Sequence, residues 1–394
     1  MLLINAHADH GRPLEPADAA FLSGDAALAV ERQIGLCPRH RPTPLLALDA
    51  LAASLGLGGI AVKDEGQRLG LGSFKALGGT FALIRLVLEA AGRALGREVA
   101  PEELQAPAVR SVAADQVFCC ATDGNHGRSV AAGARLVGAR AVVFVHEGVS
   151  AERADAIARL GATVVRVPGT YDDSVAEAAR RSAAEGWCLV SDTSWPGYER
   201  IPGLIMQGYT LVVREALQAL AMPPTHVFVQ AGVGGLAAAV AGHLALVCGT
   251  ARPTVVVVEP DRAACLLESA RHGQPTPVAP GQPTVMAMLE CYEPSLSAWR
   301  ILSRSADAFM TCTDAEAIAA LRRLARPLGT DPAIVAGESG AAGLAGLLRA
   351  AGDPGIRAAL GLDGASRVLL INTEGATDPG RYASLLEAAE GYAG

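Results

Sequence analysis

Lys75 is the residue of this sequence whose type and surroundings could support covalent chemistry with a carbonyl compound. It lies in the segment Gly72–Gly79, among mainly apolar residues and glycines, and it opens a helix predicted to follow a strand at Ile60–Lys63. The helix dipole disfavours a cation there, and partial burial would lower the pKa of the amine, as a Schiff-base lysine requires. A solvated lysine on a helix face remains the simpler interpretation of this segment taken alone.

A second polar segment, Ala121–Gly127, stands between a predicted strand and a predicted helix. It places the amide of Asn125 and the imidazole of His126 beside flexible glycines. Open α/β sheets bind their ligands at the carboxyl ends of strands. Asn125 or Asp123 could instead serve only to cap the helix, so both interpretations stay open.

A glycine loop, Gln230–Leu236, also joins a predicted strand to a predicted helix. Glycines allow backbone N–H groups to approach a phosphate at the positive end of a helix. The loop is neither a Walker loop nor a complete dinucleotide fingerprint. We interpret it as a phosphate site, with a tight turn that binds nothing as the alternative. The segments Ala336–Gly340 and Asn372–Gly375 are weaker candidates, since either could be a capped helix start.

The elements that must position these segments alternate along the chain, which predicts parallel sheets with helices on both faces. A Pro/Gly-rich break near residues 195–203 is our candidate for a crossing between two domains. The predicted strands after residue 115 are Val117–Ala121, Ala141–Val145, Thr163–Val167, Cys188–Val190, His226–Gln230, Thr254–Val258, Ala308–Thr311 and Arg367–Ile371. The predicted helices are Asn125–Val137, Ala151–Leu160, Asp172–Glu185, Ile205–Leu220, Gly235–Val247, Ala315–Ala325 and Gly340–Ala351.

Composition narrows the classes of function. A chain of 394 residues is expected to form two packed units. A formal charge of -7 without a basic cluster argues against nucleic acid, and no apolar run is long enough to suggest a membrane partner. The start of the chain shows no signal peptide. The eight cysteines form neither a disulfide scaffold nor zinc-ligand spacing, so we expect no metal and a reducing cytoplasm.

Taken together, the segments resemble the fold-type II enzymes that use pyridoxal 5'-phosphate (PLP), a family that includes threonine and serine dehydratases. The resemblance rests on the order of Pro42–Leu45, Lys63–Glu65, Ser73–Lys75, Gly124–Gly127 and Gly232–Gly235. It implies an α/β fold of two domains, each an open twisted, mostly parallel sheet flanked by helices, with the cofactor in the cleft between them. The implied large PLP-binding domain is 1–84 plus 197–394, the small domain is 85–196, and the chain is expected to be a homodimer.

The resemblance also assigns roles. Lys75 would bind PLP covalently, Asn125 would contact its phenolic oxygen, Thr373 would lie near its ring nitrogen, and the glycine loop would hold its phosphate. The implied cofactor-binding residues are Lys75, Phe74, Asn125, Gly232, Val233, Gly234, Gly235, Glu338 and Thr373. The implied catalytic residues are Lys75, Asp123 and Asp192, and the implied substrate-binding residues are Ser73, Thr122, Asp123 and Asp192.

Further motifs, among them Ser191–Trp195 and Ile205–Tyr209, are similar to a subgroup of ammonia-lyases that act on 2,3-diaminopropionate. This likeness implies elimination from the D and L isomers to give pyruvate and two ammonia through aminoacrylate. Asp123 and Asp192 would serve as bases for the D and the L isomer respectively. A dehydratase of threonine, serine or 3-hydroxyaspartate is the alternative, and a non-catalytic PLP-binding protein is the weakest hypothesis. In some of the subgroup a disulfide lies where Cys265 and Cys291 stand, although free thiols suit a reducing cytosol equally well.

Overall fold

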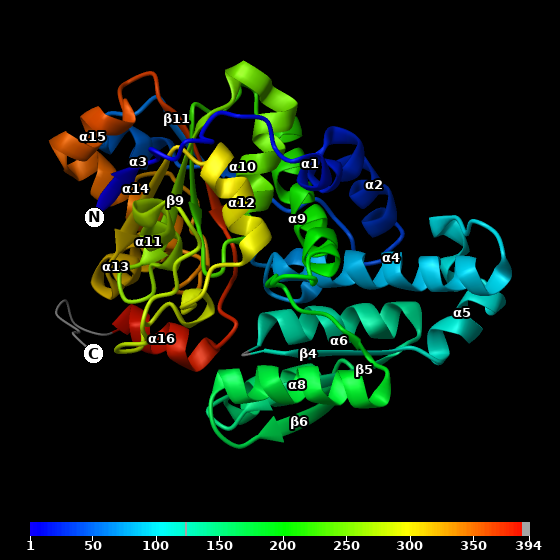
Figure 1. Ribbon diagram of the computed structural model, residues 1–394. Helices are drawn as coiled ribbons and strands as arrows, with labels where there is room; N and C mark the ends of the chain where they lie inside the picture. The colour runs from blue at the N-terminus through cyan, green and yellow to red at the C-terminus, as the bar shows by residue number, and fades with distance from the viewer. Residues whose placement is uncertain (123, 388–394) are drawn as a thin grey trace.

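Two sheets organise the chain in the computed structural model, which describes residues 1–122 and 124–387 (Figure 1). A seven-stranded sheet has the order β1-β10-β9-β8-β11-β3-β2, with only β1 and β2 antiparallel to their neighbours. A four-stranded sheet has the order β6-β5-β4-β7, and all its strands are parallel. The strands are β1 (Leu2–Ile4), β2 (Leu45–Ala47), β3 (Gly59–Asp64), β4 (Val117–Ala121), β5 (Arg140–His146), β6 (Thr163–Val167), β7 (Cys188–Leu189), β8 (His226–Gln230), β9 (Thr254–Pro260), β10 (Ala308–Cys312) and β11 (Arg367–Asn372).

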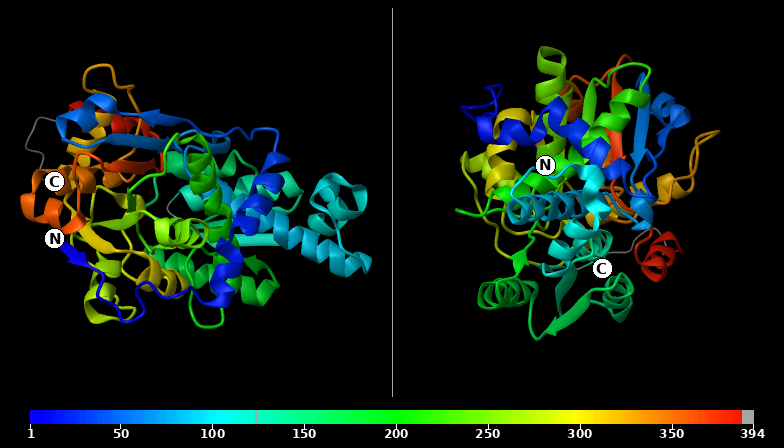
Figure 2. Two further views of the ribbon diagram at one scale, coloured as in Figure 1. Left: turned by 90° about the horizontal axis from the view of Figure 1, so that it is seen from above. Right: turned by 90° about the vertical axis from the view of Figure 1, so that its right-hand side faces the viewer.

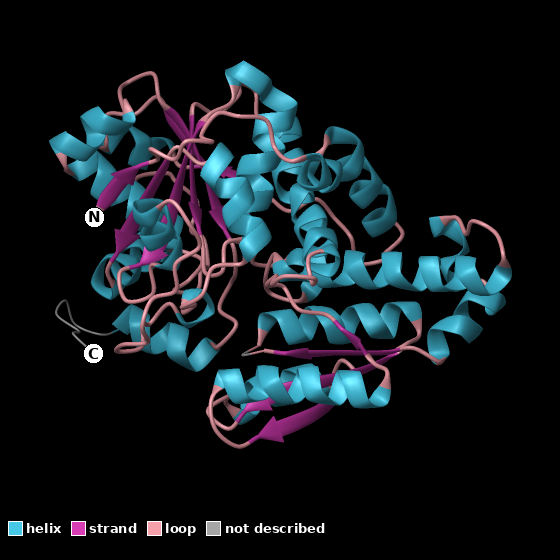
Figure 3. Ribbon diagram, viewed as in Figure 1, coloured by secondary structure: helices cyan, strands magenta, loops and turns pink. Residues whose placement is uncertain are grey.

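Helices cover both faces of the large sheet (Figure 3), which confirms the predicted fold class. The α-helices are α1 (Pro16–Leu22), α2 (Gly24–Gly35), α3 (Asp49–Ser54), α4 (Lys75–Leu95), α5 (Pro107–Ala114), α6 (Asn125–Val137), α7 (Ala151–Ala158), α8 (Tyr171–Glu185), α9 (Arg200–Ala219), α10 (Gly235–Cys248), α11 (Cys265–His272), α12 (Leu296–Ser305), α13 (Asp314–Ala325), α14 (Ala342–Gly352), α15 (Pro354–Leu360) and α16 (Pro379–Glu387). Four short 3₁₀ turns are η1 (Arg68–Gly70), η2 (Pro101–Gln105), η3 (Gly249–Ala251) and η4 (Ala287–Leu289).

The central strands of the large sheet are apolar on both faces, so each strand contributes to two cores. Val227 and Val229 of β8 pack in the core that includes α9 and α10. Phe228, between them, packs in the opposite core with α13 and α14. Side chains of a strand alternate between the two faces of the sheet, and parallel strands buried on both faces therefore carry continuous apolar runs.

The small sheet follows the same rule with its own helices. Phe118 and Cys120 of β4 face the core that contains α4 and α6, whereas Cys119 faces a smaller cluster with Ala178 of α8. Both cysteines are fully buried. The carboxyl end of β4 points toward the large sheet (Figure 1), so residues 122 and 124–127 lie between the two sheets.

The helix α4 joins the two parts of the molecule. It packs against α6 on one side and α9 on the other, and in the view from above it extends away from the large sheet together with α5 (Figure 2, left). Where α4 crosses α9 the backbones nearly touch, since a Cβ added at Gly208 would lie 2.8 Å from the Cα of Gly78. The predicted domain boundary at 84/85 falls inside this continuous helix, and the division into domains stays a prediction.

The positions of the predicted elements agree with the structure from β4 onward, with shifts at their ends. The largest shift is in α9, which begins at Arg200 rather than at the predicted Ile205. Pro202 lies in its first turn, where a missing N–H removes no helical hydrogen bond. The strands β1 and β2 and the helices α1, α2, α3, α5, α11, α12, α15 and α16 were not predicted. None of the described helices has the length and apolar character needed to cross a membrane.

Candidate active site

Lys75 lies where the segment that follows β3 meets the segment that follows β11. It is the first residue of α4, which follows β3 through the turn η1. The preceding residues pair with the segment that follows β11: the Phe74 N–H donates to the Thr373 carbonyl at 3.0 Å, and the Gly375 N–H donates to the Gly72 carbonyl at 3.0 Å. The carboxyl ends of parallel strands meet at one edge of a sheet, so this pairing fixes the backbone before Lys75 at that edge.

Asp192 is the carboxylate that faces Lys75. The Lys75 Nζ donates to Asp192 Oδ2 at 2.6 Å, although the two residues are 117 positions apart. Burial opposes ionisation of Asp192, but the adjacent Lys75 ammonium outweighs it, so the pKa of Asp192 lies below its ordinary value. The carboxylate is therefore ionised at neutral pH and is able to accept a proton.

Backbone contacts hold Asp192 in this position. The hydroxyl of Tyr198 donates to the Leu189 carbonyl at 2.7 Å and accepts from the Ser191 N–H at 3.0 Å. The ring of Tyr198 stacks on Trp195 with centroids 4.2 Å apart. The turn of residues 195–198 thus fixes the backbone on which the Asp192 carboxylate is carried.

His126 lies behind Asp192 and is uncharged. Its Nε2 is 2.7 Å from the Val190 carbonyl, and because a carbonyl can only accept, Nε2 carries the proton. Burial lowers the pKa of the imidazole, although Asp192 acts in the opposite direction. The Nδ1 therefore presents a lone pair toward Asp192 Oδ2 at 3.8 Å, and sequence reasoning had assigned His126 no role.

Asn125 is oriented by a buried carboxyl group. Its Nδ2 donates to Glu374 Oε2 at 2.6 Å, and both side chains are buried. Burial, together with the nearby Glu338 carboxylate, raises the pKa of Glu374 to about 7. Glu374 was quoted in the sequence motif but not predicted as a site residue, because a single carboxylate after a strand is also a common helix cap.

The glycine loop has the geometry of an anion site. Gly234 has a positive φ of 104°, and α10 starts at Gly235 with no side-chain cap and no acidic residue in its first turn. Its first N–H groups are consequently available to an acceptor. The loop is tightly enclosed, since a Cβ added at Gly232 would lie 2.8 Å from the Cys291 Sγ.

The two cysteines of the implied disulfide both lie near the glycine loop. The Cys265 Sγ donates weakly to the Gly232 carbonyl at 3.8 Å, and the Cys291 Sγ is the atom that a Cβ at Gly232 would meet. The disulfide implied by the resemblance stays a prediction.

Thr373 is held by the strand that precedes the glycine loop. Gln230 Nε2 donates to Thr373 Oγ1 at 3.0 Å and also lies within hydrogen-bond distance of the Ser339, Gly340 and Ile371 carbonyls. Gln230 thereby connects three of the segments singled out in the sequence. Its importance could not be recognised beforehand, because an amide at the end of a strand has many ordinary roles.

The remaining predicted residues are also near this edge. Phe74 packs edge-on against Tyr209 with centroids 4.7 Å apart, Ser73 is buried opposite Glu374, and Val233 lies in the glycine loop. The Thr122 hydroxyl accepts from the Gly124 and Gly127 N–H groups, so it caps α6. Asp123 lies outside the described residues.

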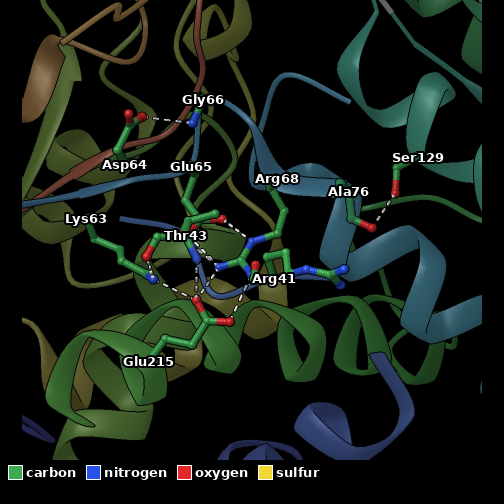
Figure 4. Close-up of polar contacts among 10 residues, drawn as sticks. All are labelled: Arg41, Thr43, Lys63, Asp64, Glu65, Gly66, Arg68, Ala76, Ser129 and Glu215. Atoms are coloured by element: carbon green, nitrogen blue, oxygen red, sulfur yellow. Dashed lines mark hydrogen bonds and ion pairs between the residues drawn. The ribbon is translucent and has the colours of Figure 1, made fainter. Parts of the chain in front are cut away.

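A buried group of four charged side chains fixes the segment that leads to Lys75 (Figure 4). Arg68 donates to both oxygens of Glu65 and to both oxygens of Glu215, at 2.6–2.8 Å. Lys63 donates to Glu215 Oε2 at 2.6 Å. The exposed fraction of these side chains is at most 5%. The two positive and two negative charges balance, and they tie β3 and η1 to α9.

The donor set fits PLP. An amine at Lys75, an amide at Asn125, a hydroxyl at Thr373 and the uncapped start of α10 supply a covalent anchor, two polar contacts and a phosphate site. When bound, PLP withdraws electrons from the α-carbon of an amino acid. The structure brings the predicted lysine, amide and glycine loop to the same edge of the large sheet.

The comparisons agree with this class of site. The sequence profile of the family described as "Pyridoxal-phosphate dependent enzyme" matches residues 36–374, so the chain belongs to this family of PLP-dependent enzymes.

Among individual relatives, the diaminopropionate ammonia-lyase of Escherichia coli K12 is 39% identical over 94% of this chain and 95% of its own length. The diaminopropionate ammonia-lyase of Salmonella typhimurium LT2 is 38% identical over 92% of this chain and 91% of its own. A solved structure of the E. coli lyase in complex with D-serine aligns with a TM-score of 0.89 at 36% identity, covering 98% of this chain and 96% of that one. Another, with an aminoacrylate-PLP azomethine reaction intermediate, aligns with a TM-score of 0.86 at 35% identity over the same shares of both chains.

The buried charges predict a large effect of Glu215→Gln on stability. The substitution leaves Lys63 and Arg68 facing a single carboxylate in a place that water does not reach, so the free energy of unfolding should fall by about 3–5 kcal/mol. Urea denaturation measures this change. Glu177→Gln, which breaks the exposed pair with Arg180, is the matched control and should change stability far less. Equal effects of the two substitutions would contradict the role given to the buried group.

The raised pKa of Glu374 predicts a pH-dependent stability. Between its ordinary value of 4.5 and about 7, the folded chain holds a proton that the unfolded chain releases. This contribution is present below pH 4.5 and is lost as the pH rises through about 7. In Glu374→Gln the loss should be absent, so the variant should gain on the order of 3 kcal/mol relative to the original chain between pH 4.5 and 8.

Urea denaturation of the cofactor-free chain across this pH range measures the effect of Glu374→Gln. Glu293→Gln alters an exposed carboxylate and serves as the control, with a profile parallel to that of the original chain. If the Glu374→Gln profile were also parallel, the carboxyl would not be the group that holds the proton.

Proposed function

We propose that this chain is a lyase that uses PLP to remove the β-amino group of 2,3-diaminopropionate, giving pyruvate and two ammonia through aminoacrylate. The observation that carries the proposal is the 2.6 Å contact between Lys75 Nζ and Asp192 Oδ2, since an elimination needs a base near the α-carbon of a substrate held on the PLP that Lys75 would anchor. Two relatives named diaminopropionate ammonia-lyase align over more than nine-tenths of the chain, which supports the choice of substrate.

Some side chains of the site would bind PLP, and others would transfer protons. Lys75 would anchor PLP, the N–H groups of Gly232–Gly235 would bind its phosphate, and Asn125, oriented by Glu374, would contact its phenolic oxygen. Asp192 is ionised and would accept the proton from the α-carbon of the L isomer at Oδ2. The neutral His126 ring lies 3.8 Å from that carboxylate and adds no positive charge beside it.

Activity on both isomers of the substrate would require a second base besides Asp192. Asp192 approaches Lys75 from the turn that precedes α9, whereas Asp123 precedes α6, on a different part of the chain. A substrate held between these two segments would present the α-proton of opposite isomers to opposite carboxylates. We therefore propose Asp123 as the base for the D isomer.

A dehydratase of serine, threonine or 3-hydroxyaspartate is the second candidate. A solved structure of the E. coli lyase is in complex with D-serine, so a hydroxy amino acid enters the site of that relative. A carboxylate at residue 123, however, suits a cationic β-amine better than a hydroxyl group. A PLP carrier without catalysis is less favoured, because binding the cofactor requires no ionised carboxylate beside Lys75.

The proposal includes three further residues near the substrate, namely Ser73, Thr122 and Glu338. Ser73 lies in the segment that leads to Lys75, Thr122 lies in the segment that contains Asn125, and both would contact the substrate. Glu338 would line the site, where it already raises the pKa of Glu374. We also propose that the enzyme acts as a homodimer in the reducing cytoplasm.

A substrate panel tests the reaction. The purified holoenzyme is given both isomers of 2,3-diaminopropionate, serine and threonine, and pyruvate or 2-oxobutyrate and ammonia are measured. We expect the diamine to have the highest kcat/KM and to release two ammonia for each pyruvate. Lys75→Ala should lose both the visible absorbance of covalently bound PLP and the activity. A kcat/KM for serine or threonine far above that for the diamine would replace the proposed reaction with the second candidate.

The two-base assignment has its own prediction. Asp192→Asn removes a proton acceptor, and a general base typically contributes about 10²–10⁴-fold, so kcat for the L isomer should fall by that amount while the D isomer keeps most of its rate. Asp123→Asn should show the reverse preference. Equal losses for both isomers in either variant would mean that one base serves both.

A further inference from the structure

A cavity of about 280 Å³ lies beside the predicted site but is lined by other residues. Its walls come from the loop between β3 and α4, the start of α6, the helix α7 and residues 375–379. Lys75, Asp192 and the glycine loop are not among its described lining residues. Asn125 is the one residue named above as a cofactor contact that also lines the cavity, and its amide is already bonded to Glu374.

Three arginines line this cavity, namely Arg128 of α6 and Arg153 and Arg159 of α7. Within the described ranges, none of their guanidinium groups forms an ion pair or a hydrogen bond, and the Arg128 Nε is buried without a partner. Burial lowers the pKa of Arg128, and the positive charge of Arg159 lowers it further. Among the lining residues that the structure describes, the exposed Glu152 is the one that carries a carboxylate, and the three arginines outnumber it.

The guanidinium groups reach the two segments that build the site. A Cβ added at Gly72 would lie 3.5 Å from the Arg128 Nη1, and a Cβ added at Gly124 would lie 3.8 Å from the Arg153 Cδ. Gly72 belongs to the segment that leads to Lys75, and Gly124 immediately precedes Asn125. Arg153 also lowers the pKa of Glu374 through its charge. A negative group in the cavity would therefore act on both segments at once.

We propose that this cavity binds a small oxyanion, a carboxylate or a phosphate, held by Arg128 and Arg153 with Arg159 at its edge. Guanidinium groups recognise such anions with paired, charge-assisted hydrogen bonds, and among the residues that the structure describes no carboxylate pairs with them. The anion could come from two sources: a free ion in solution, or the carboxylate of an amino acid that enters the cleft. The proposal does not depend on which leaving group the enzyme removes.

Calorimetric titration of the holoenzyme with inorganic phosphate tests the site. PLP must be saturating, because otherwise the glycine loop would itself take up phosphate, and the ionic strength must be low, because salt screens surface charges. We expect Arg128→Gln and Arg153→Gln each to weaken phosphate binding by about tenfold or more, since each removes charge-assisted hydrogen bonds. Arg128→Lys, which keeps the charge, should restore part of the affinity and excludes a loss caused by misfolding.

Arg135→Gln is the matched control. It lies on the same helix as Arg128, two turns further on, is exposed, and does not line the cavity, so phosphate binding should be unchanged. If the original holoenzyme bound no phosphate, or bound it equally well in the Arg128→Gln, Arg153→Gln and Arg135→Gln variants, and the KM for substrate were also unchanged, the proposed site would be disproved.

Substrate competition separates the two sources of the anion. If an amino-acid substrate displaces phosphate and Arg128→Gln raises KM while kcat is retained, the cavity receives the substrate carboxylate. If phosphate binds equally well with and without substrate, the cavity takes a free anion. Either result supports an oxyanion site, and both would be measured on the holoenzyme whether or not 2,3-diaminopropionate proves to be the preferred substrate.

Discussion

The structure depends on the buried contact between Arg68 and Glu215, in which a guanidinium and a carboxylate are removed from water together. Removing such charges from water is costly unless each is fully paired, and here Glu65 and Lys63 complete the pairing. Since each of the four charges is paired with the others, the segment between β3 and α4 is tied to α9. Lys75 directly follows this segment, so its backbone is fixed by the same contacts.

Hydrogen bonds between segments also fix the positions of two other side chains of the site, Asp192 and Asn125. The Tyr198 hydroxyl bonds to the backbone of Leu189 and Ser191, which precede Asp192, and Asn125 is oriented by Glu374. In both cases the supporting residue fixes a group that would contact the substrate or the cofactor. The chemistry of the site thus rests on polar contacts between segments that are distant in sequence and adjacent in the fold.

The fold and the principal anchor could be predicted from the sequence because they depend on local patterns. Alternating apolar runs located the strands from β4 onward, and the glycine loop and Lys75 were marked by neighbours in the chain. The supporting residues could not be found in this way. Glu374, His126 and Gln230 have ordinary interpretations where they stand, and their roles arise from partners more than 60 positions away. The arginines of α6 and α7 were overlooked for a similar reason, since three isolated cations do not form a cluster until the helices are packed.

The close approach of α4 to α9 has a mechanical consequence. With Gly78 against Gly208, the first turn of α4 is held by backbone contact and cannot slide past α9. The helix has 21 residues and is therefore about 30 Å long, with α6 and the small sheet attached along it. If this helix tilts as a rigid body about the contact near Gly78, its far end moves most. The small sheet can then shift by several ångströms while Lys75, about one turn from that contact, hardly moves.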